Sequence, residues 1–149
     1  MRFVYNSIIF LLEGILLLIK PFNNKIGKFI IERKNTLEYL DANLNNGDKN
    51  IWIHVASLGE YEQGLPIFSE IKKLYKDHKI ILSFFSSSGY ELRKNNPISD
   101  FTIYLPIDSK KNAEDFINIV KPKKVFFVKY DFWPNYLYYL KVNNIPTFL

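Results

Sequence analysis

The sequence predicts an α/β fold in which a Rossmann-like parallel sheet is flanked by helices and preceded by an apolar N-terminal helix. Three observations support this prediction. From residue 51 onward, short β-prone apolar runs alternate with helical patterns, which is typical of right-handed strand–helix–strand crossovers. These runs are continuously apolar, as expected for strands that are covered on both faces. Residues 3–19 are mostly apolar and stand apart from the rest.

The composition excludes several classes of protein. With 149 residues, 48% of them apolar, the chain suits one domain with a hydrophobic core. The absence of cysteine excludes disulfides, cysteine-ligated zinc and thiol catalysis. His54 and His78 are the only histidines, so we expect no metal site. The net charge of +5 favours anionic partners, such as phosphorylated lipid headgroups, nucleotides or nucleic acid, without choosing among them.

The apolar segment at residues 3–19 lies between Arg2 and Lys20, and Glu13 interrupts it. A bilayer span needs about 20 apolar residues, and no small-residue cleavage site follows of the kind that ends a signal peptide. We predict that residues 1–21 form a membrane anchor, either a marginal span or a helix lying in the interface. A soluble hydrophobic helix packed on the domain is the alternative. If the segment spans, the basic residues after it keep the rest of the chain in the cytoplasm.

The other elements are predicted from local patterns. Residues 22–50 are polar and indicate a short amphipathic helix and a linker, with a turn near Gly47. Strands are predicted at 51–56, 80–85, 101–105, 125–128 and from 145 onward, with helices at 60–75, 90–95, 108–120 and 133–142. Residues 51–149 therefore form the Rossmann-like domain. Because Leu149 lies inside the last predicted strand, we interpret the chain as part of a longer protein.

In such sheets, ligands gather at the carboxyl ends of the strands, which places loops 57–60, 86–89 and 129–134 at one rim. Gly59 allows a tight turn and the close approach of a ligand. Glu60 lies at a helix start, where peptide dipoles favour a carboxylate. Such a carboxylate can act as a general base toward an attacking hydroxyl. From spacing alone, helix-end electrostatics remains the preferred explanation.

The other two loops also have two interpretations each. Ser86, Ser88 and Gly89 suit either a phosphate at a helix N-terminus or ordinary capping. Asp131 either caps the next helix or holds a sugar hydroxyl, beside Trp133. His54 lies within a predicted strand and is interpreted as a core histidine. The sequence contains no dinucleotide fingerprint, P-loop, Ser–His–Asp pattern or nucleic-acid signature, so we expect no nucleic-acid partner.

Several short motifs follow one another in a fixed order from residue 51 to the end. Residues 51–60 have the sequence I-W-I-H-V-A-S-L-G-E. Further motifs stand at residues 85–90, 104–108, 121–123, 132–135 and 144–146. In order and spacing they resemble the 3-deoxy-D-manno-octulosonic acid (Kdo) transferase family, which carries a W-x-H-x-x-S-x-G-E signature.

The resemblance implies a GT-B architecture, in which two Rossmann-like halves face a cleft. This chain corresponds to the N-terminal half, which receives the lipid A precursor, and contains nothing that corresponds to the C-terminal half, which binds CMP-Kdo. The reaction is an inverting transfer without a metal or other cofactor, at the cytoplasmic face of the bacterial inner membrane. We expect the chain alone to be inactive. A non-catalytic membrane-associated binding domain and another GT-B glycosyltransferase half remain the alternatives.

The resemblance also assigns site residues. Glu60 falls on the family's general base. The residues expected to bind substrate are Ser57, Gly59, Ser86, Ser88, Gly89, Asp131 and Trp133. Asp131 is shorter than the glutamate that is usual at its position. The family commonly has another acid two residues earlier, where this chain has Lys129.

Overall fold

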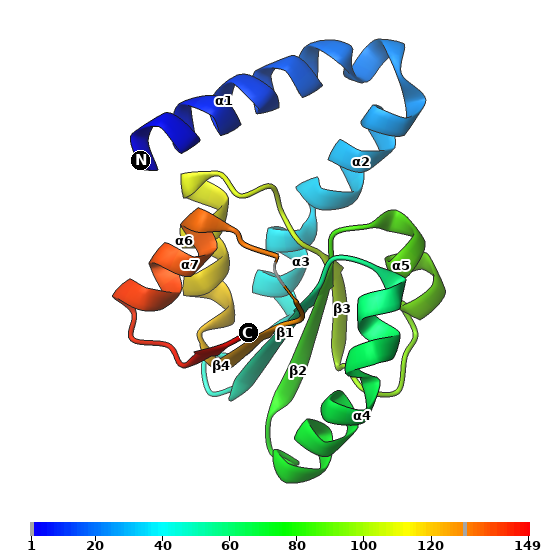
Figure 1. The fold of residues 1–149 in the computed structure, drawn as a ribbon, viewed down its shortest axis with the longest axis vertical. Coiled ribbons are helices and arrows are strands. Elements are labelled where there is room, and N and C mark those ends of the chain that lie inside the picture. The colour runs from blue at the N-terminus through cyan, green and yellow to red at the C-terminus, as the bar shows by residue number, and fades with distance from the viewer. Residues whose placement is uncertain (1, 130) are drawn as a thin grey trace.

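The computed structural model describes residues 2–129 and 131–149, so that Met1 and Tyr130, the latter in the predicted rim loop, lie outside the described residues. Five parallel strands form one sheet in the order β3-β2-β1-β4-β5 (Figure 1). The strands are β1 (Asn50–Val55), β2 (Lys79–Phe84), β3 (Phe101–Tyr104), β4 (Pro122–Phe127) and β5 (Thr147–Phe148). The predicted Rossmann-like parallel sheet, preceded by an apolar helix, is confirmed.

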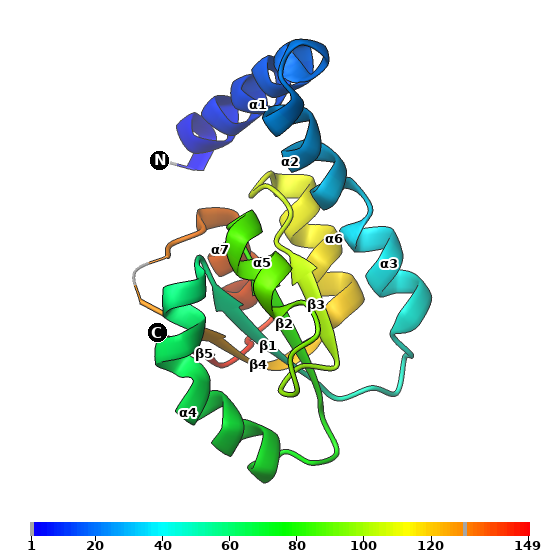
Figure 2. The ribbon, with the colours of Figure 1, turned by 90° about the vertical axis from the view of Figure 1, so that its right-hand side faces the viewer.

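Helices cover both faces of the sheet (Figure 2). On one face, α4 (Leu58–Leu74) and α5 (Ser87–Arg93) pack over alternate strand residues such as Ile53. On the other face, α3 (Thr36–Asn43), α6 (Lys110–Val120) and α7 (Pro134–Val142) pack around Trp52. Because successive strand side chains point to opposite faces, neighbouring residues of one strand enter two separate cores. This explains why each strand is apolar throughout.

The segment at residues 22–50 differs from the single short helix and linker that the sequence predicts. It contains two helices, α2 (Asn24–Lys34) and α3, and a short 3₁₀ helix, η1 (Lys20–Phe22), precedes them. The side-chain oxygen of Asn23 accepts the backbone N–H groups of Lys25 and Ile26, which starts α2. Leu40 is fully buried and fixes α3 against the domain. The segment is therefore largely helical and packed.

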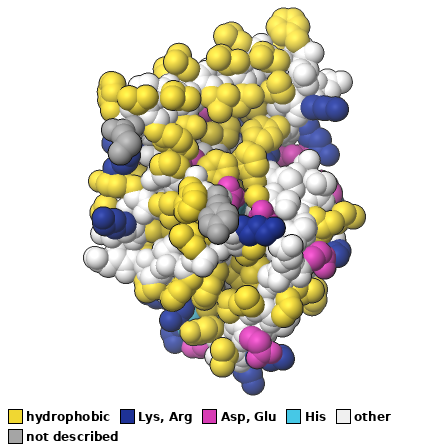
Figure 3. Space-filling view, in the orientation of Figure 1, with side chains coloured by type: hydrophobic (Ala, Val, Ile, Leu, Met, Phe, Trp, Pro, Cys, Tyr) yellow, Lys and Arg dark blue, Asp and Glu magenta, His cyan; other side chains and the backbone are white. Residues whose placement is uncertain are grey.

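The first helix, α1 (Arg2–Ile19), turns several of its polar residues toward the domain. The guanidinium of Arg2 lies 3.2 Å from the centre of the Tyr138 ring. The Asn6 side-chain oxygen accepts a hydrogen bond from the Asn135 amide at 2.8 Å. The large apolar residues of α1 that are exposed are Phe3, Val4, Ile8, Phe10, Leu11, Leu12, Ile15, Leu17, Leu18 and Ile19. Figure 3 shows hydrophobic side chains along this helix. Its outer surface is therefore apolar.

Asp108 is the buried carboxylate that joins α1 and α7 to the end of β3. Its Oδ2 and Oδ1 accept the backbone N–H groups of Asn135 and Tyr136, both at 3.0 Å, and Oδ2 also accepts the Tyr5 hydroxyl at 2.8 Å. The first turn of α7 is thus capped by Asp108, and the interpretation of Asp131 as its cap is wrong. Burial raises the pKa of Asp108 to about 6, against the opposing effect of these hydrogen bonds.

The raised pKa of Asp108 predicts how stability depends on pH. In the unfolded chain this carboxyl loses its proton near pH 4, whereas in the fold it does so at about 6. Between these values the folded state binds more protons, so the free energy of unfolding falls as pH rises. The full effect is about 3 kcal/mol. Denaturant unfolding of the wild type and Asp108→Asn at pH 4 and pH 7 measures it.

We expect the stability of the wild type, relative to Asp108→Asn, to decrease between pH 4 and pH 7. Asp115→Asn, which alters an exposed carboxylate of α6, is the matched control and should show no such trend. A difference between the wild type and Asp108→Asn that is the same at both pH values contradicts the prediction.

Candidate functional site

The carboxyl ends of three neighbouring strands form the candidate site. β1 lies between β2 and β4 in parallel register, with Val55 beside Phe84 and His54 beside Phe127. Residues 57–60 and 86–89, which are the N-caps and first turns of α4 and α5, and the described part of 129–134 follow these strand ends. The three loops predicted to share a rim therefore leave the sheet at the same edge.

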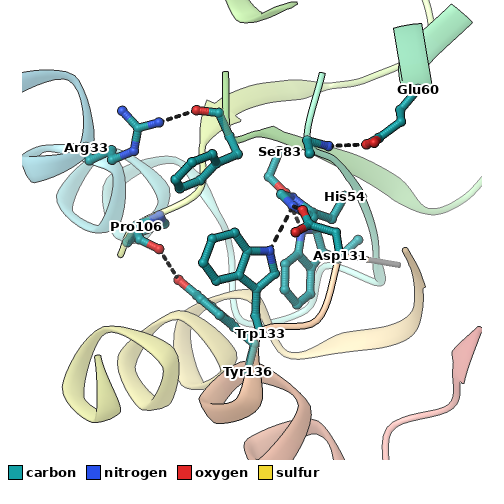
Figure 4. A network of polar contacts seen from close by, with 11 residues as sticks. Arg33, His54, Glu60, Ser83, Pro106, Asp131, Trp133 and Tyr136 are labelled. Atoms are coloured by element: carbon teal, nitrogen blue, oxygen red, sulfur yellow. Dashed lines mark hydrogen bonds and ion pairs between the residues drawn. The ribbon is translucent and has the colours of Figure 1, made fainter. Parts of the chain in front are cut away.

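Glu60 lies in the first turn of α4 and reaches back over the end of β1 (Figure 4). Its Oε2 accepts the backbone N–H of Ala56 at 2.5 Å, while the Ser57 hydroxyl accepts the backbone N–H of Glu60 at 3.4 Å. Glu60 and Ser57 thus satisfy backbone groups at the start of the helix. Within the described chain, Oε1 of Glu60 has no hydrogen-bond partner. The helix-start role therefore leaves one carboxylate oxygen of the half-buried Glu60 available on the rim.

His54 is buried at the end of β1, and both of its ring nitrogens have partners (Figure 4). Nε2 lies 2.7 Å from Oδ2 of Asp131, and Nδ1 lies 2.7 Å from the Ser83 hydroxyl. Because a carboxylate only accepts, Nε2 carries a proton. The Ser83 oxygen also accepts the indole N–H of Trp52 at 2.7 Å, so Ser83 joins the buried Trp52 and His54 side chains. The expected core histidine therefore also orients a rim carboxylate.

Asp131 is held as a charged carboxylate. The Trp133 indole N–H lies 3.2 Å from Nε2 of His54 and also bonds to the Asp131 carboxylate. Burial by itself would raise the pKa of Asp131, but the hydrogen bond and charge of His54 and the hydrogen bond of Trp133 outweigh it. The pKa therefore lies below its ordinary value, and Asp131 is ionised at neutral pH.

The remaining predicted site residues divide into two groups. Ser86 caps α5 by accepting the Gly89 N–H at 3.2 Å. A Cβ on Gly89 would lie 2.7 Å from Cδ1 of Phe84, so the glycine permits close packing. Ser88 and Gly59 are exposed, and a Cβ on Gly59 would have 3.9 Å to its nearest neighbour. Ser86 and Gly89 are thus explained by folding alone, while Gly59 and Ser88 remain accessible to a ligand.

An aromatic wall that the sequence analysis missed closes one side of the rim. The rings of Phe85 and Trp133 lie 5.0 Å apart. The buried guanidinium of Arg33, from α2, donates to the Phe85 carbonyl and lies 3.6 Å from the centre of the Phe29 ring (Figure 4). The sequence could have indicated a role for Ser83, because it is a polar residue inside an otherwise apolar predicted strand. It could not have indicated Arg33, because Arg33 is one of several basic residues after the apolar segment.

Among residues 2–129 and 131–149, no group of three or more His, Asp or Glu side chains is arranged to hold a metal ion.

Known proteins are similar in sequence to this domain. The profile of a family described as 3-Deoxy-D-manno-octulosonic-acid transferase (kdotransferase) matches residues 29–149. A 3-deoxy-D-manno-octulosonic acid transferase of Aquifex aeolicus is 34% identical over 103 residues, which cover 68% of this chain and 28% of that protein. Another, of Haemophilus influenzae, is 32% identical over 99 residues, or 66% of this chain and 23% of the relative.

A further relative is a bifunctional glycosyltransferase/methyltransferase of Fusobacterium nucleatum. It is 29% identical over 129 residues, which cover 80% of this chain and 19% of that protein. The aligned parts thus span between 19% and 28% of the length of these relatives.

The buried Asp131–His54 pair predicts a specific loss of stability. Asp131→Ala leaves the N–H groups of His54 and Trp133 without their acceptor, which we expect to cost about 1–3 kcal/mol at pH 7. Because the pKa of Asp131 is lowered in the fold, its contribution is present above pH 4 and is lost as pH falls further. Urea unfolding at pH 7 and pH 3 measures both effects.

Asp115→Ala is the control, because it removes one partner of an exposed pair on α6 and should change stability by less than about 0.5 kcal/mol. If Asp131→Ala is no more costly than this control at pH 7, the described pair does not stabilise the rim.

Proposed function

This chain belongs to the family of 3-deoxy-D-manno-octulosonic acid (Kdo) transferases, and from that membership we propose that it provides the lipid-acceptor side of Kdo transfer from CMP-Kdo to a lipid A precursor. The observation that carries the proposal is the Glu60 carboxylate, which ends the W-x-H-x-x-S-x-G-E motif and lies on the rim. Since the aligned parts cover about a quarter of the Aquifex and Haemophilus relatives, we assign donor binding to a further half of such an enzyme. The chain alone is then inactive.

Glu60 acts as the general base in this proposal. One carboxylate oxygen is fixed by the Ala56 N–H, and the other takes the proton of the attacking sugar hydroxyl. The hydroxyl oxygen forms a bond to the anomeric carbon of Kdo while the bond from that carbon to the phosphate oxygen breaks. The electron pair leaves with CMP. Attack opposite to the leaving group inverts the anomeric carbon.

The other rim residues position the sugar of the lipid acceptor. Asp131 is ionised, so it accepts a hydrogen bond from a sugar hydroxyl, and Trp133 offers an aromatic wall. Gly59 and Ser88 leave open space beside Glu60 and at the start of α5. Ser57, Ser86 and Gly89 keep the two loops in place through capping and packing.

We also propose that α1 lies in the membrane interface. The segment Arg2–Phe22 has a mean hydropathy of 1.9, and by length and composition alone it could cross a bilayer. A signal sequence can have the same length and composition. The side chains of Tyr5 and Asn6, however, bond to the domain, so that the apolar face points outward. A helix held in this way exposes one apolar face to lipid, as an interfacial helix does. In this proposal the rim lies at the cytoplasmic face of the inner membrane.

The role of Glu60 is tested in a fusion that adds the donor-binding half of a related Kdo transferase after Leu149. Glu60→Gln keeps the shape and the Ala56 contact but removes the base, so we expect transfer to fall by about 10²- to 10⁴-fold. The assay measures Kdo transferred from CMP-Kdo to a lipid A precursor. The unfused chain should give no transfer.

Glu62→Gln is the matched control, because Glu62 is exposed on the same helix and pairs with Arg93. It should keep full activity. If Glu60→Gln is as active as Glu62→Gln, Glu60 is not the base. If the fusion binds the lipid A precursor but never transfers Kdo, a non-catalytic binding domain becomes the better explanation. Transfer from a donor other than CMP-Kdo would indicate another GT-B enzyme.

The membrane role of α1 is tested by vesicle flotation. Replacing the exposed Phe10 and Leu18 with serine removes apolar area from the outer face of α1, so we expect binding to anionic vesicles to weaken at least about tenfold. The same double change at the exposed Ile67 and Leu74 of α4 is the control and should leave binding unchanged. Removal of residues 1–20 should abolish binding. Equal binding by all forms rules out α1 as the membrane contact.

A further inference from the structure

A pocket of about 380 Å³ lies beneath the C-terminal half of α1. Leu16 of α1, Ile30 of α2 and Leu37 of α3 form an apolar wall, and Pro106 and Ile107 close it on the side of β3. The volume is within the range of pockets that hold small ligands, which are typically about 300–1,000 Å³. Transfer of an apolar group from water into an apolar pocket is favourable. The lining of this pocket therefore indicates a hydrocarbon ligand.

Two cations border this apolar wall. Arg33 and the exposed Lys34 both line the pocket. Burial lowers the pKa of Arg33 to about 10, so it stays charged at neutral pH. Glu13 is the acidic group of the lining, and burial raises its pKa against the opposing effect of a hydrogen bond to Ser109 at the start of α6, so burial works against a negative charge there. A hydrocarbon wall beside Arg33 and Lys34 matches a lipid whose headgroup carries phosphate.

The pocket shares a wall with the candidate catalytic rim. Arg33 lines the pocket and donates to the carbonyl of Phe85, at the end of β2. The Phe85 ring packs on Trp133, which bonds to the His54–Asp131 pair. Arg33 and the Phe85 ring thus lie between a lipid chain in the pocket and the rim. This arrangement favours a lipid whose headgroup reacts at the rim over a bulk membrane lipid.

We propose that this pocket holds one acyl chain of the lipid acceptor, with Arg33 and Lys34 beside its phosphorylated headgroup. The inference rests on the proposed function, because it requires a lipid acceptor at the rim. It adds a site for the hydrocarbon part of that lipid. The outer face of α1 then contacts the membrane, while the inner side of the same helix takes a single chain from it.

The test fills the pocket from two sides. Leu16→Trp fills it from α1 and Ile30→Trp fills it from α2, while Ile67→Trp places the same side chain on the exposed surface of α4. Binding of the full chain is measured to phosphatidylcholine vesicles that contain either a tetraacylated lipid A precursor or phosphatidylglycerol at equal phosphate. Thermal unfolding and circular dichroism establish that each variant is folded.

We expect the wild type and Ile67→Trp to prefer the vesicles with the lipid A precursor. Leu16→Trp and Ile30→Trp should lose that preference by at least about tenfold, which equals about 1.4 kcal/mol, while still binding phosphatidylglycerol vesicles. If folded pocket variants keep the preference, the pocket is not the acyl site although the proposed function stands. If they weaken binding to both vesicle types equally, the pocket takes bulk lipid and the inference is wrong. If the wild type shows no preference, the acceptor-side function fails as well.

Discussion

The buried carboxylate of Asp108 is the contact on which the positions of several other elements depend. It accepts two backbone N–H groups from the first turn of α7 and the hydroxyl of Tyr5 from α1. Since Trp133 immediately precedes α7, fixing the start of that helix also fixes the indole on the rim. The same carboxylate therefore sets the position of a site residue and the orientation of the apolar helix. Three donors around one carboxylate compensate part of its desolvation, and the raised pKa shows that they do not compensate all of it.

A second constraint reaches Trp133 from the opposite side. Arg33 holds the Phe85 carbonyl, and the Phe85 ring packs against the Trp133 ring. The guanidinium lies among the rings of Phe29, Phe85 and Tyr104, where cation–π attraction offsets part of the cost of burying it. The indole is thus fixed from α7 and from α2. α2 directly follows the apolar helix and η1. Through Arg33, the aromatic wall of the rim therefore contacts the helix next to the segment that we assign to the membrane.

The sequence was sufficient to predict the sheet, because the alternation of apolar runs and helical stripes is a local property that burial on both faces imposes. It was not sufficient for the contacts that shape the site. His54 and Asp131 are 77 positions apart, and they meet because β4 pairs with β1, an order that no local pattern encodes. Nor could it orient α1, whose residues are apolar on nearly every side. The inward face is decided by the distant partner of Tyr5.

The two carboxylates on the rim illustrate why the motif alone left their roles open. A serine or an acid at a helix start suits both capping and ligand binding, since both use the same backbone N–H groups. The surroundings separate the two acids. Asp131 is bonded by an imidazole and an indole, which lowers its pKa and makes it a weaker base. Glu60 is held through one oxygen by a single backbone N–H, and its other oxygen has no partner in the described part of the chain. In the proposed reaction, Glu60 is therefore better suited to accept the proton of a sugar hydroxyl, while Asp131 keeps its charge and orients the sugar.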